Sequence, residues 1–239
     1  MPHQVFNADE VAEYLHMSRA EVDDLAKRRE IPFEDRGGRL VFRRQEIDAW
    51  GSQRVLALEG RQLDDYHRTA SARRLDLSQG AELMPVLIDV DLIEPALTSR
   101  TKSSVLRDLV ALADGRGMLS DPAALLCGLE EREKLCSTAL PGGLALLHVR
   151  HQDPFLFLES FVACGRVTQT IYAGAPDGSA TDLFFLICCQ DDRSHLHTLA
   201  RLCSMCMNTG MLAALRSAAD AKSMRVAILD AEKQVLKHM

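Results

Sequence analysis

Histidine is the residue type in this sequence best suited to chemistry near neutral pH, and one histidine directly follows a short apolar run. Leu144 to Leu147 predicts a strand that ends in His148, with Arg150 and His151 soon after. An imidazole at a strand end can lie in a cleft, where a pKa of about 6.5 leaves it largely neutral and nucleophilic at pH 7. A histidine that faces solvent or only forms hydrogen bonds is the alternative. The pattern alone leaves both open.

A scaffold must position such a histidine, and the chain from about Ala81 onward alternates helical and strand signals, as in an α/β domain. Apolar residues at helical spacing predict helices over 103–113 and 122–132. A glycine turn at Pro141-Gly142-Gly143 precedes the strand, and another helical run starts near Leu196. The order of these elements places His148 between two helical regions.

The stretch from Glu131 to His148 resembles the active-site segment of the fructose–mannitol type enzyme IIA domains of the bacterial sugar phosphotransferase system, including the nitrogen-regulatory IIA proteins. The matching residues are Arg132-Glu133, Ser137-Thr138, Gly142-Gly143 and the strand that ends in His148. Residues 172–187 resemble a turn and strand of the family, and 194–202 resemble the helix that carries a second functional histidine. The match covers about 84–235 and implies a mixed sheet flanked by helices.

The resemblance implies a phosphoryl relay. His148 would accept the phosphoryl group from a histidine phosphocarrier protein, and His195 would hydrogen-bond the phosphoryl oxygens. Arg132 would supply positive charge, because its guanidinium fork suits phosphate geometry; without the motif it is a solvated charge at a helix end. The Thr138 hydroxyl either orients a histidine or bonds the backbone of the turn. His197 lies two residues past His195, so on a helix it should point elsewhere, toward the surface.

Two neighbours of His148 depart from the family pattern. Members usually have Pro before the active histidine and a small residue after it, where this chain has Leu147 and Val149. Val149 is bulkier and stiffer than glycine, so we expect it to crowd the incoming donor. Phosphorylation is therefore expected to be slow or donor-specific, and loss of phosphorylation is a further alternative.

The N-terminal fifty residues read as two capped helices and a hairpin. Asn7 and Ser18 are predicted N-caps, and Glu21 completes a capping box with Ser18. A Gly37-Gly38 turn then joins two short strands, and a closing helix is expected over 44–50. The order resembles the excisionase-type, MerR-like winged helix-turn-helix domain. The resemblance implies DNA contacts by Arg19, Lys27, Arg28, Arg36, Arg39 and Arg43.

The charge of this region argues against strong DNA binding. Residues 1–52 carry eight Lys and Arg against eleven Asp and Glu, a net charge of −3. The expected recognition helix also carries Glu21, Asp23 and Asp24. An acidic module gains little from counterion release. A winged helix that binds protein instead of DNA is therefore the alternative.

Composition sets outer limits on the function. The chain has 239 residues, 47% hydrophobic and 26% charged, with a net charge of −6, which suits a folded globular protein and excludes a disordered or collagen-like chain. The longest uncharged stretch, 135–149, is shorter than the roughly 20 residues of a membrane span. The start has no signal-peptide pattern, so a cytoplasmic location is expected. Cys203 and Cys206 have CxxC spacing but lie in a helical run, which favours packing over metal or redox chemistry.

Together these patterns predict an α/β protein with three regions: a winged helix-turn-helix over 1–52, a partly helical linker over 53–83, and a IIA-like phosphocarrier domain over 84–239. The leading hypothesis is a regulator of the phosphotransferase system in which phosphorylation of His148 signals nitrogen or carbon state and biases what the N-terminal domain binds. The alternatives are a transport component that passes phosphate to a IIB domain, and a non-phosphorylated module that binds a regulatory target protein. No metal or other cofactor is predicted.

Overall fold

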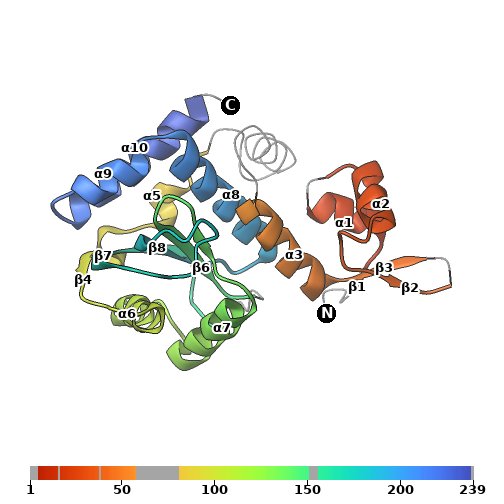
Figure 1. Ribbon diagram of the computed structural model, residues 1–239, viewed down its shortest axis with the longest axis horizontal. Helices are drawn as coiled ribbons and strands as arrows, with labels where there is room; N and C mark the ends of the chain where they lie inside the picture. Colours follow the sequence, from red (N-terminus) through yellow and green to blue (C-terminus); the bar gives the residue numbers. More distant parts are fainter. Residues whose placement is uncertain (1–4, 16, 38, 58–80, 151–155, 238–239) are drawn as a thin grey trace.

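A computed structural model describes residues 5–15, 17–37, 39–57, 81–150 and 156–237 (Figure 1). The N-terminal part is built from short elements, and the C-terminal part contains a five-stranded sheet with helices on both faces. The N-terminal elements are β1 (Val5–Phe6), α1 (Ala8–Tyr14), α2 (Arg19–Lys27), β2 (Glu34–Asp35), β3 (Leu40–Arg43) and α3 (Arg44–Ala57). This order confirms the predicted helix-turn-helix with a hairpin.

Both predicted helix caps are present. The Asn7 side chain accepts from the backbone N–H groups of Asp9 and Glu10, and Ser18 forms the capping box with Glu21 at the start of α2. Strands β2 and β3 pair antiparallel, so Arg36, Gly37 and Arg39 lie at the tip of a wing. Gly38, part of the predicted turn, lies outside the described residues.

Helix α3 is longer than predicted. It continues to Ala57 instead of ending at Trp50, and so runs through the predicted boundary at residue 52. Ile47 is buried in the N-terminal apolar core, and the Trp50 indole donates to the backbone oxygen of Glu30 at 2.6 Å. Most of the predicted linker, residues 58–80, lies outside the described residues.

The C-terminal sheet has the strand order β4-β7-β8-β6-β5. Strands β7 and β8 are antiparallel, whereas the β4–β7 and β6–β8 pairs are parallel. The elements of this part are α5 (Met84–Leu87), a 3-10 turn (Val90–Leu92), β4 (Ile93–Leu97), α6 (Lys102–Gly115), α7 (Pro122–Leu135), β5 (Ala139–Leu140), β6 (Leu144–His148), β7 (Phe161–Ile171), β8 (Thr181–Cys188), α8 (Asp192–Asn208), α9 (Met211–Ser217) and α10 (Ala221–Lys237). This is the predicted mixed sheet flanked by helices.

Two apolar layers sandwich the sheet, because successive side chains of a strand point to opposite faces. Leu144 and Leu146 of β6 join the core under α8 and α10, whereas Ala145 and Leu147 join the core over α6 and α7. Figure 1 shows these helices above and below the strands. All of β6 is buried, so its last residue is held in a fixed register.

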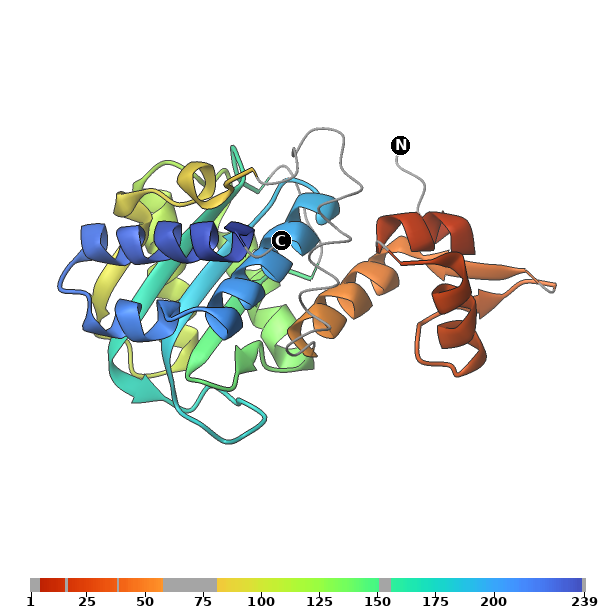
Figure 2. The same ribbon diagram turned by 90° about the horizontal axis from the view of Figure 1, so that it is seen from above.

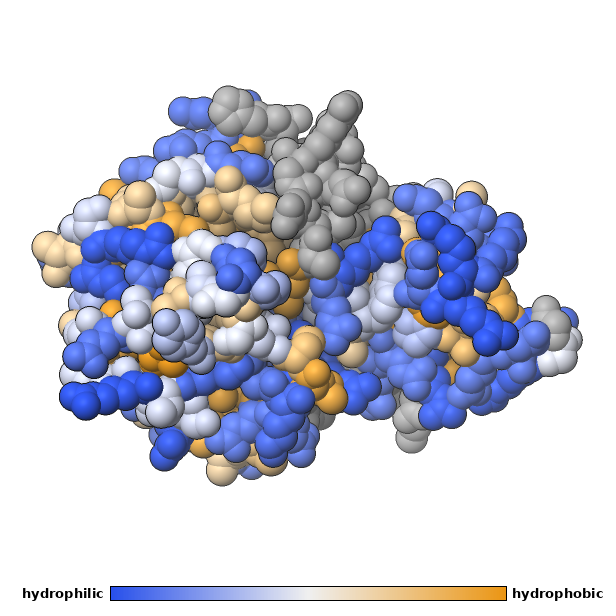
Figure 3. Space-filling model, viewed as in Figure 1, coloured by the Kyte–Doolittle hydropathy of each residue, from blue (hydrophilic) through white to orange (hydrophobic). Residues whose placement is uncertain are grey.

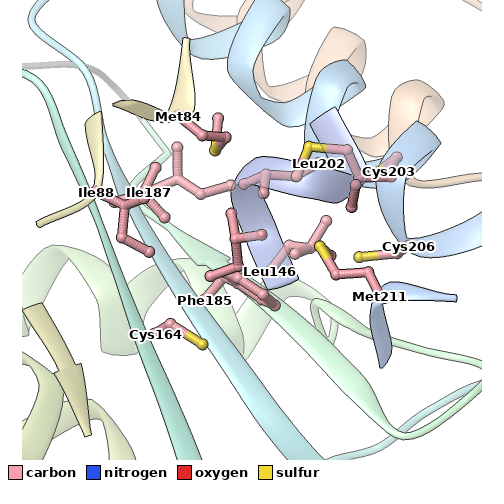
Figure 4. Packing of buried hydrophobic residues seen from close by; sticks show 14 of the residues in the cluster. Met84, Ile88, Leu146, Cys164, Phe185, Ile187, Leu202, Cys203, Cys206 and Met211 are labelled. Atoms are coloured by element: carbon pink, nitrogen blue, oxygen red, sulfur yellow. The ribbon is translucent and has the colours of Figure 1, made fainter. Parts of the chain in front are cut away.

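The CxxC cysteines lie in the first of these two layers. Cys203 and Cys206 pack among Leu202, Met211 and other apolar side chains in Figure 4. Burial raises the pKa of Cys203 to about 12, which keeps its thiol protonated at neutral pH. Their position agrees with the packing role expected from the sequence.

The surface view shows how the apolar residues are distributed. Hydrophilic side chains cover most of the N-terminal part on the face seen in Figure 3, and apolar side chains form only scattered patches there. None of the helices in the described part of the chain combines the length and hydropathy needed to cross a bilayer.

Candidate functional site

His148 lies at the end of β6, and the β6 backbone sets the state of its ring. Nδ1 lies 2.8 Å from the carbonyl oxygen of Leu146, two residues earlier on the same strand. A carbonyl oxygen only accepts, so Nδ1 carries the proton and Nε2 presents a lone pair. Nε2 is buried and has no hydrogen-bond partner within the described structure. The reactive nitrogen of a neutral imidazole is thus left free.

His195 faces His148 from α8. The two ring centroids are 4.9 Å apart. Asp191 caps α8 by accepting from the Ser194 N–H, so His195 lies in the first turn of the helix. The Nε2 atom of His195 lies 3.2 Å from the Ser52 hydroxyl of α3, a residue of the N-terminal part. The structure therefore brings together the two histidines that the sequence singled out.

Both histidines are buried, not exposed in a cleft as the sequence suggested. His148 is 1% exposed and His195 is fully buried. Burial lowers the pKa of His148 well below its ordinary value, and the charges of His195 and Arg132 lower it further. Burial lowers the pKa of His195 to about 4, although the nearby Asp192 opposes the shift. Both rings are neutral at pH 7.

Arg132, near the end of α7, is a buried cation next to these rings. Its side chain is 1% exposed, and its Nη1 donates to the backbone oxygen of Cys136 at 3.1 Å. Its Nη2 is buried without a hydrogen-bond partner, and Arg132 forms no ion pair within the described residues. A solvated charge at the helix end, the alternative from sequence, is excluded. A buried guanidinium in this state favours an incoming anion.

Thr138 lies nearby but contacts neither histidine. Its hydroxyl donates to the carboxylate of Glu133, which also accepts from Lys102 Nζ at 2.8 Å. Both expectations for this hydroxyl, that it orients a histidine or bonds the turn backbone, are corrected by this contact. Thr138 instead joins α7 to β5 and so positions the segment that carries Arg132.

Val149 does not stand in the path of a donor. Its side chain is buried in the core over α6 and α7, and a Cβ on Gly128 of α7 would come within 3.3 Å of it. The glycine at residue 128 makes room for the larger side chain on the far side of the sheet from His195. The expected crowding by Val149 is therefore not found. Leu147 is likewise turned into this core.

The expected position of His197 is also corrected. It was expected on the surface, but it is 3% exposed. Every residue of α8 from His195 to Cys206 is buried, because the helix lies between the sheet, α10 and α3. The spacing of His195 and His197 in the sequence does not show that α8 is covered on all sides.

Sequence reasoning missed a cluster of groups that α3 adds to the site. Arg44 donates to a carboxylate oxygen of Asp192 from Nε and Nη2, at 3.0 and 2.8 Å. Asp48 is 2% exposed and accepts from the Tyr14 hydroxyl at 3.4 Å. Burial raises the pKa of Asp48, the nearby Asp192 raises it further, and Arg132 acts in the opposite direction. Asp48 lies in the predicted closing helix over 44–50, but nothing in the sequence joined it to this site.

The six cations proposed for DNA contact lie on α2, at its C-cap and on the wing, and five of them form ion pairs with nearby acids. Arg19 pairs with Asp9 and Asp23, Lys27 with Asp24, Arg28 with Glu30, and Arg36 and Arg43 both with Glu34. Arg39 has no acidic partner within the described part of the chain. The wing is therefore held by ion pairs and offers one free cation among the six.

The types of group around His148 suit the binding of an anion. A neutral imidazole with a free Nε2 lies beside a second neutral imidazole and an arginine with an unpartnered nitrogen. No group of His, Cys, Asp and Glu suited to a metal ion was found within the described residues. These groups suit phosphoryl transfer, which depends on positioning and charge neutralisation.

Two family models match the chain. The model described as "Phosphoenolpyruvate-dependent sugar phosphotransferase system, EIIA 2" matches residues 86–231, and the helix-turn-helix domain model matches residues 5–54. A fructose-specific EIIABC component of the phosphotransferase system of Bacillus subtilis is 26% identical over 113 residues, which are 46% of this chain. The match spans 17% of the length of that relative.

Solved structures share the fold of the C-terminal part. The nitrogen regulatory protein IIA-Ntr of Neisseria meningitidis matches with a TM-score of 0.54 at 22% identity, over 61% of this chain and 97% of its own. The mannitol IIA of Escherichia coli matches with a TM-score of 0.51 at 15% identity, over 59% and 98%. The same mannitol IIA in complex with phosphorylated IIB also scores 0.51, at 14% identity, over 59% and 96%. At these identities the likeness establishes the fold alone.

Proposed function

The chain belongs to the EIIA 2 family of the phosphoenolpyruvate-dependent sugar phosphotransferase system, and from this premise we propose that it is a regulator in which His148 accepts a phosphoryl group. The donor is the phosphohistidine of a histidine phosphocarrier protein. The helix-turn-helix domain is the output, and it binds DNA when its state changes. One observation carries the proposal: the free Nε2 of His148 and the unpartnered Nη2 of Arg132 are both buried, and the charge of Arg132 acts on the His148 ring.

The chemistry follows from the ring states. The Nε2 lone pair attacks the phosphorus of the donor phosphohistidine, a P–N bond forms at His148, and the P–N bond to the donor imidazole breaks. The donor ring, protonated on its other nitrogen, leaves as a neutral imidazole. The His148 Nδ1–H stays on the Leu146 carbonyl, which stabilises the positive charge that develops on the ring.

Arg132 and His195 act on the group that is transferred. The free Arg132 Nη2 would bind a phosphoryl oxygen, and His195 would donate to a second one. Because burial keeps His195 neutral, it supplies a hydrogen bond without a second full charge. This division of roles needs no metal at the acceptor.

Regulation is favoured over transport by the domain that accompanies the IIA fold. The nitrogen regulatory IIA-Ntr has this fold, as does the mannitol IIA that was solved bound to phosphorylated IIB. A helix-turn-helix domain at residues 5–54 has no evident role in passing phosphate to a IIB domain, but it suits an output that responds to phosphorylation.

Radiolabelled phosphoenolpyruvate, enzyme I and the histidine phosphocarrier protein test the proposal on the full chain. We expect an acid-labile, alkali-stable label that His148→Ala abolishes. His197→Gln, which replaces another buried histidine of the same domain, should keep the label. Both variants are compared by circular dichroism to show that they fold.

Each other outcome has a defined meaning. Undiminished labelling of His148→Ala would move the acceptor to another residue. Rapid transfer from the labelled chain to a IIB domain upon addition of sugar would make it a transport component instead. A folded chain that takes no label under any condition would be a binding module.

A further inference from the structure

Helix α3 belongs to both parts of the molecule. It starts directly after β3, and in both views it lies between the N-terminal elements and α8 (Figures 1 and 2). Ile47 is buried in the N-terminal apolar core, and that core also includes Leu196 of α8. A Cβ on Gly51 would lie 3.6 Å from Leu196, at ordinary van der Waals distance, so the α3 backbone passes close to α8.

Polar contacts hold this helix at the His148 site. At the first turn of α3, Arg44 pairs with Asp192, whose side chain is 12% exposed. Two turns further along, the Ser52 hydroxyl contacts His195 Nε2 at 3.2 Å, and both residues are buried. One imidazole of the proposed phosphoryl site is therefore already engaged by a side chain of the DNA-binding part.

The docked position is incompatible with phosphoryl transfer for steric reasons. Reacting atoms must come within about 3–3.5 Å of each other. His148 Nε2 has no accessible surface, and its partner His195 lies under Ser52. A donor domain can reach this nitrogen only after the covering elements have moved.

The charges at the α3–α8 interface also oppose docking of α3 onto a phosphorylated site. The α3–α8 interface holds two carboxyl groups, Asp48 and Asp192, close enough to each other that Asp192 raises the pKa of Asp48. A phosphoryl group adds a charge of up to about −2. Arg132 acts on both Asp48 and His148, so a phosphoryl group on His148 would lie near these interface acids.

We propose that α3 and the phosphocarrier protein bind alternately to one surface of the IIA domain, so that docked α3 blocks His148 and a phosphoryl group on His148 keeps α3 undocked. This rests on the proposed function of His148. By linkage, docking and phosphorylation weaken each other by the same factor. Release of α3 is the change that reaches the helix-turn-helix, because α3 is its last helix.

Charge reversal at the interface tests this competition. Arg44→Glu places two acids opposite each other and should raise the rate of labelling of His148 by the carrier about 10- to 100-fold, the factor expected for breaking a partly buried charge pair. Arg44→Glu with Asp192→Arg restores the pair and should return the rate toward that of the wild type. Arg107→Glu makes the same change on an exposed residue of α6 and should leave the rate unaltered.

Hydrogen exchange on the wild-type chain gives a second test that needs no variant. Phosphorylation by the carrier should accelerate amide exchange in residues 44–57 and at the start of α8, while β7 and β8 keep their protection. Equal labelling rates in wild type and Arg44→Glu, or unchanged exchange in α3, would overturn the competition and leave the proposed acceptor intact. Failure of both the wild type and Arg44→Glu to take label would overturn the proposed function itself.

Discussion

In the proposed function Arg132 binds an anion, and this role has a cost in the chain without a phosphoryl group. Its guanidinium is buried, and one nitrogen lacks a partner within the described structure. A buried cation that lacks a full set of partners destabilises the fold, so residues of this kind are retained for function. A substitution of Arg132 should therefore change stability and activity in different ways.

We expect Arg132→Met to lower the rate of phosphoryl transfer about 10- to 100-fold, the loss of one charge-assisted interaction of about 1.5–3 kcal/mol. The apolar side chain keeps most of the volume, so the Tm of the unphosphorylated chain should stay level or rise. Labelling kinetics and thermal melts check both. Leu129→Ala, one turn earlier on α7, is the control: it should lower Tm and spare transfer. A fall in Tm for Arg132→Met equal to that of Leu129→Ala would contradict the assigned role.

The two histidines also predict how stability depends on pH. Their pKa values are lowered in the fold, that of His195 to about 4, so the unfolded chain binds more protons below about pH 6.5. Stability is therefore lost as pH falls from about 6.5 to about 4. Asp48, whose pKa is raised, acts in the opposite direction in this range. Two histidines against one carboxyl leave a net slope of about 1.4 kcal/mol per pH unit.

Urea unfolding at several pH values measures this slope. His195→Gln should flatten it, because one of the two titrating rings is gone. Asp48→Asn should steepen it, because the opposing carboxyl is gone. A slope that neither substitution changes would mean that other groups determine the acid sensitivity.

At the scale of elements, the turn before β6 shows how one backbone position determines the placement of a site residue. Gly143 has φ +82°, and a Cβ there would meet Arg216 at 2.7 Å and the Ala180 backbone oxygen at 3.2 Å. Arg216 itself donates to Asp182 and to the Gly142 oxygen, so it has little freedom to move. The turn fixes where β6 starts, and hence the position of His148 at the end of this strand.

Gly143→Ala should therefore lower the free energy of unfolding by about 2–3 kcal/mol, from left-handed strain together with the clash. Gly178→Ala is the matched control, since Gly178 has φ +71° and open space around its Cα, and should cost about 1 kcal/mol. Denaturant melts compare the two. Equal losses would show that the crowding at residue 143 is relieved elsewhere.

The wing is the element that tests the proposed DNA binding. Arg39→Ala should weaken binding of a mixed-sequence duplex and reduce its salt slope by roughly 0.9, one phosphate contact. Asp23→Asn should strengthen binding, because it removes a like charge and releases Arg19 from an ion pair. Anisotropy titrations of the full chain at several salt concentrations measure both, with Arg107→Ala as the unaffected control. Absence of salt-dependent binding even in low salt would make the domain a protein-binding module.

For the whole molecule, local signals in the sequence predict most of the architecture. Caps at Asn7 and Ser18, helical spacing over 103–113 and the apolar run before His148 each predict a local structure, and each is present. The long strand β7 and the C-terminal helix α10 were not identified. Both are shaped by contacts with distant segments, which periodicity does not report.

The sequence predicted which residues lie together in the site, but not that another helix covers them. His148, His195 and Arg132 were found through a family resemblance, and they do lie together. Their burial was not found, because the covering helix comes from the other domain. The Ser52–His195 and Arg44–Asp192 contacts each join residues more than a hundred positions apart. No local pattern marks such pairs.

The close approach at Gly51 has a consequence for how this chain can vary among organisms. A methyl group at residue 51 would come 2.9 Å from a Leu15 methyl and 3.6 Å from Leu196, one residue in each domain. A larger residue at this position should therefore appear in related chains together with a smaller one at 15. A residue at 51 larger than alanine would extend the same constraint to residue 196 of the other domain.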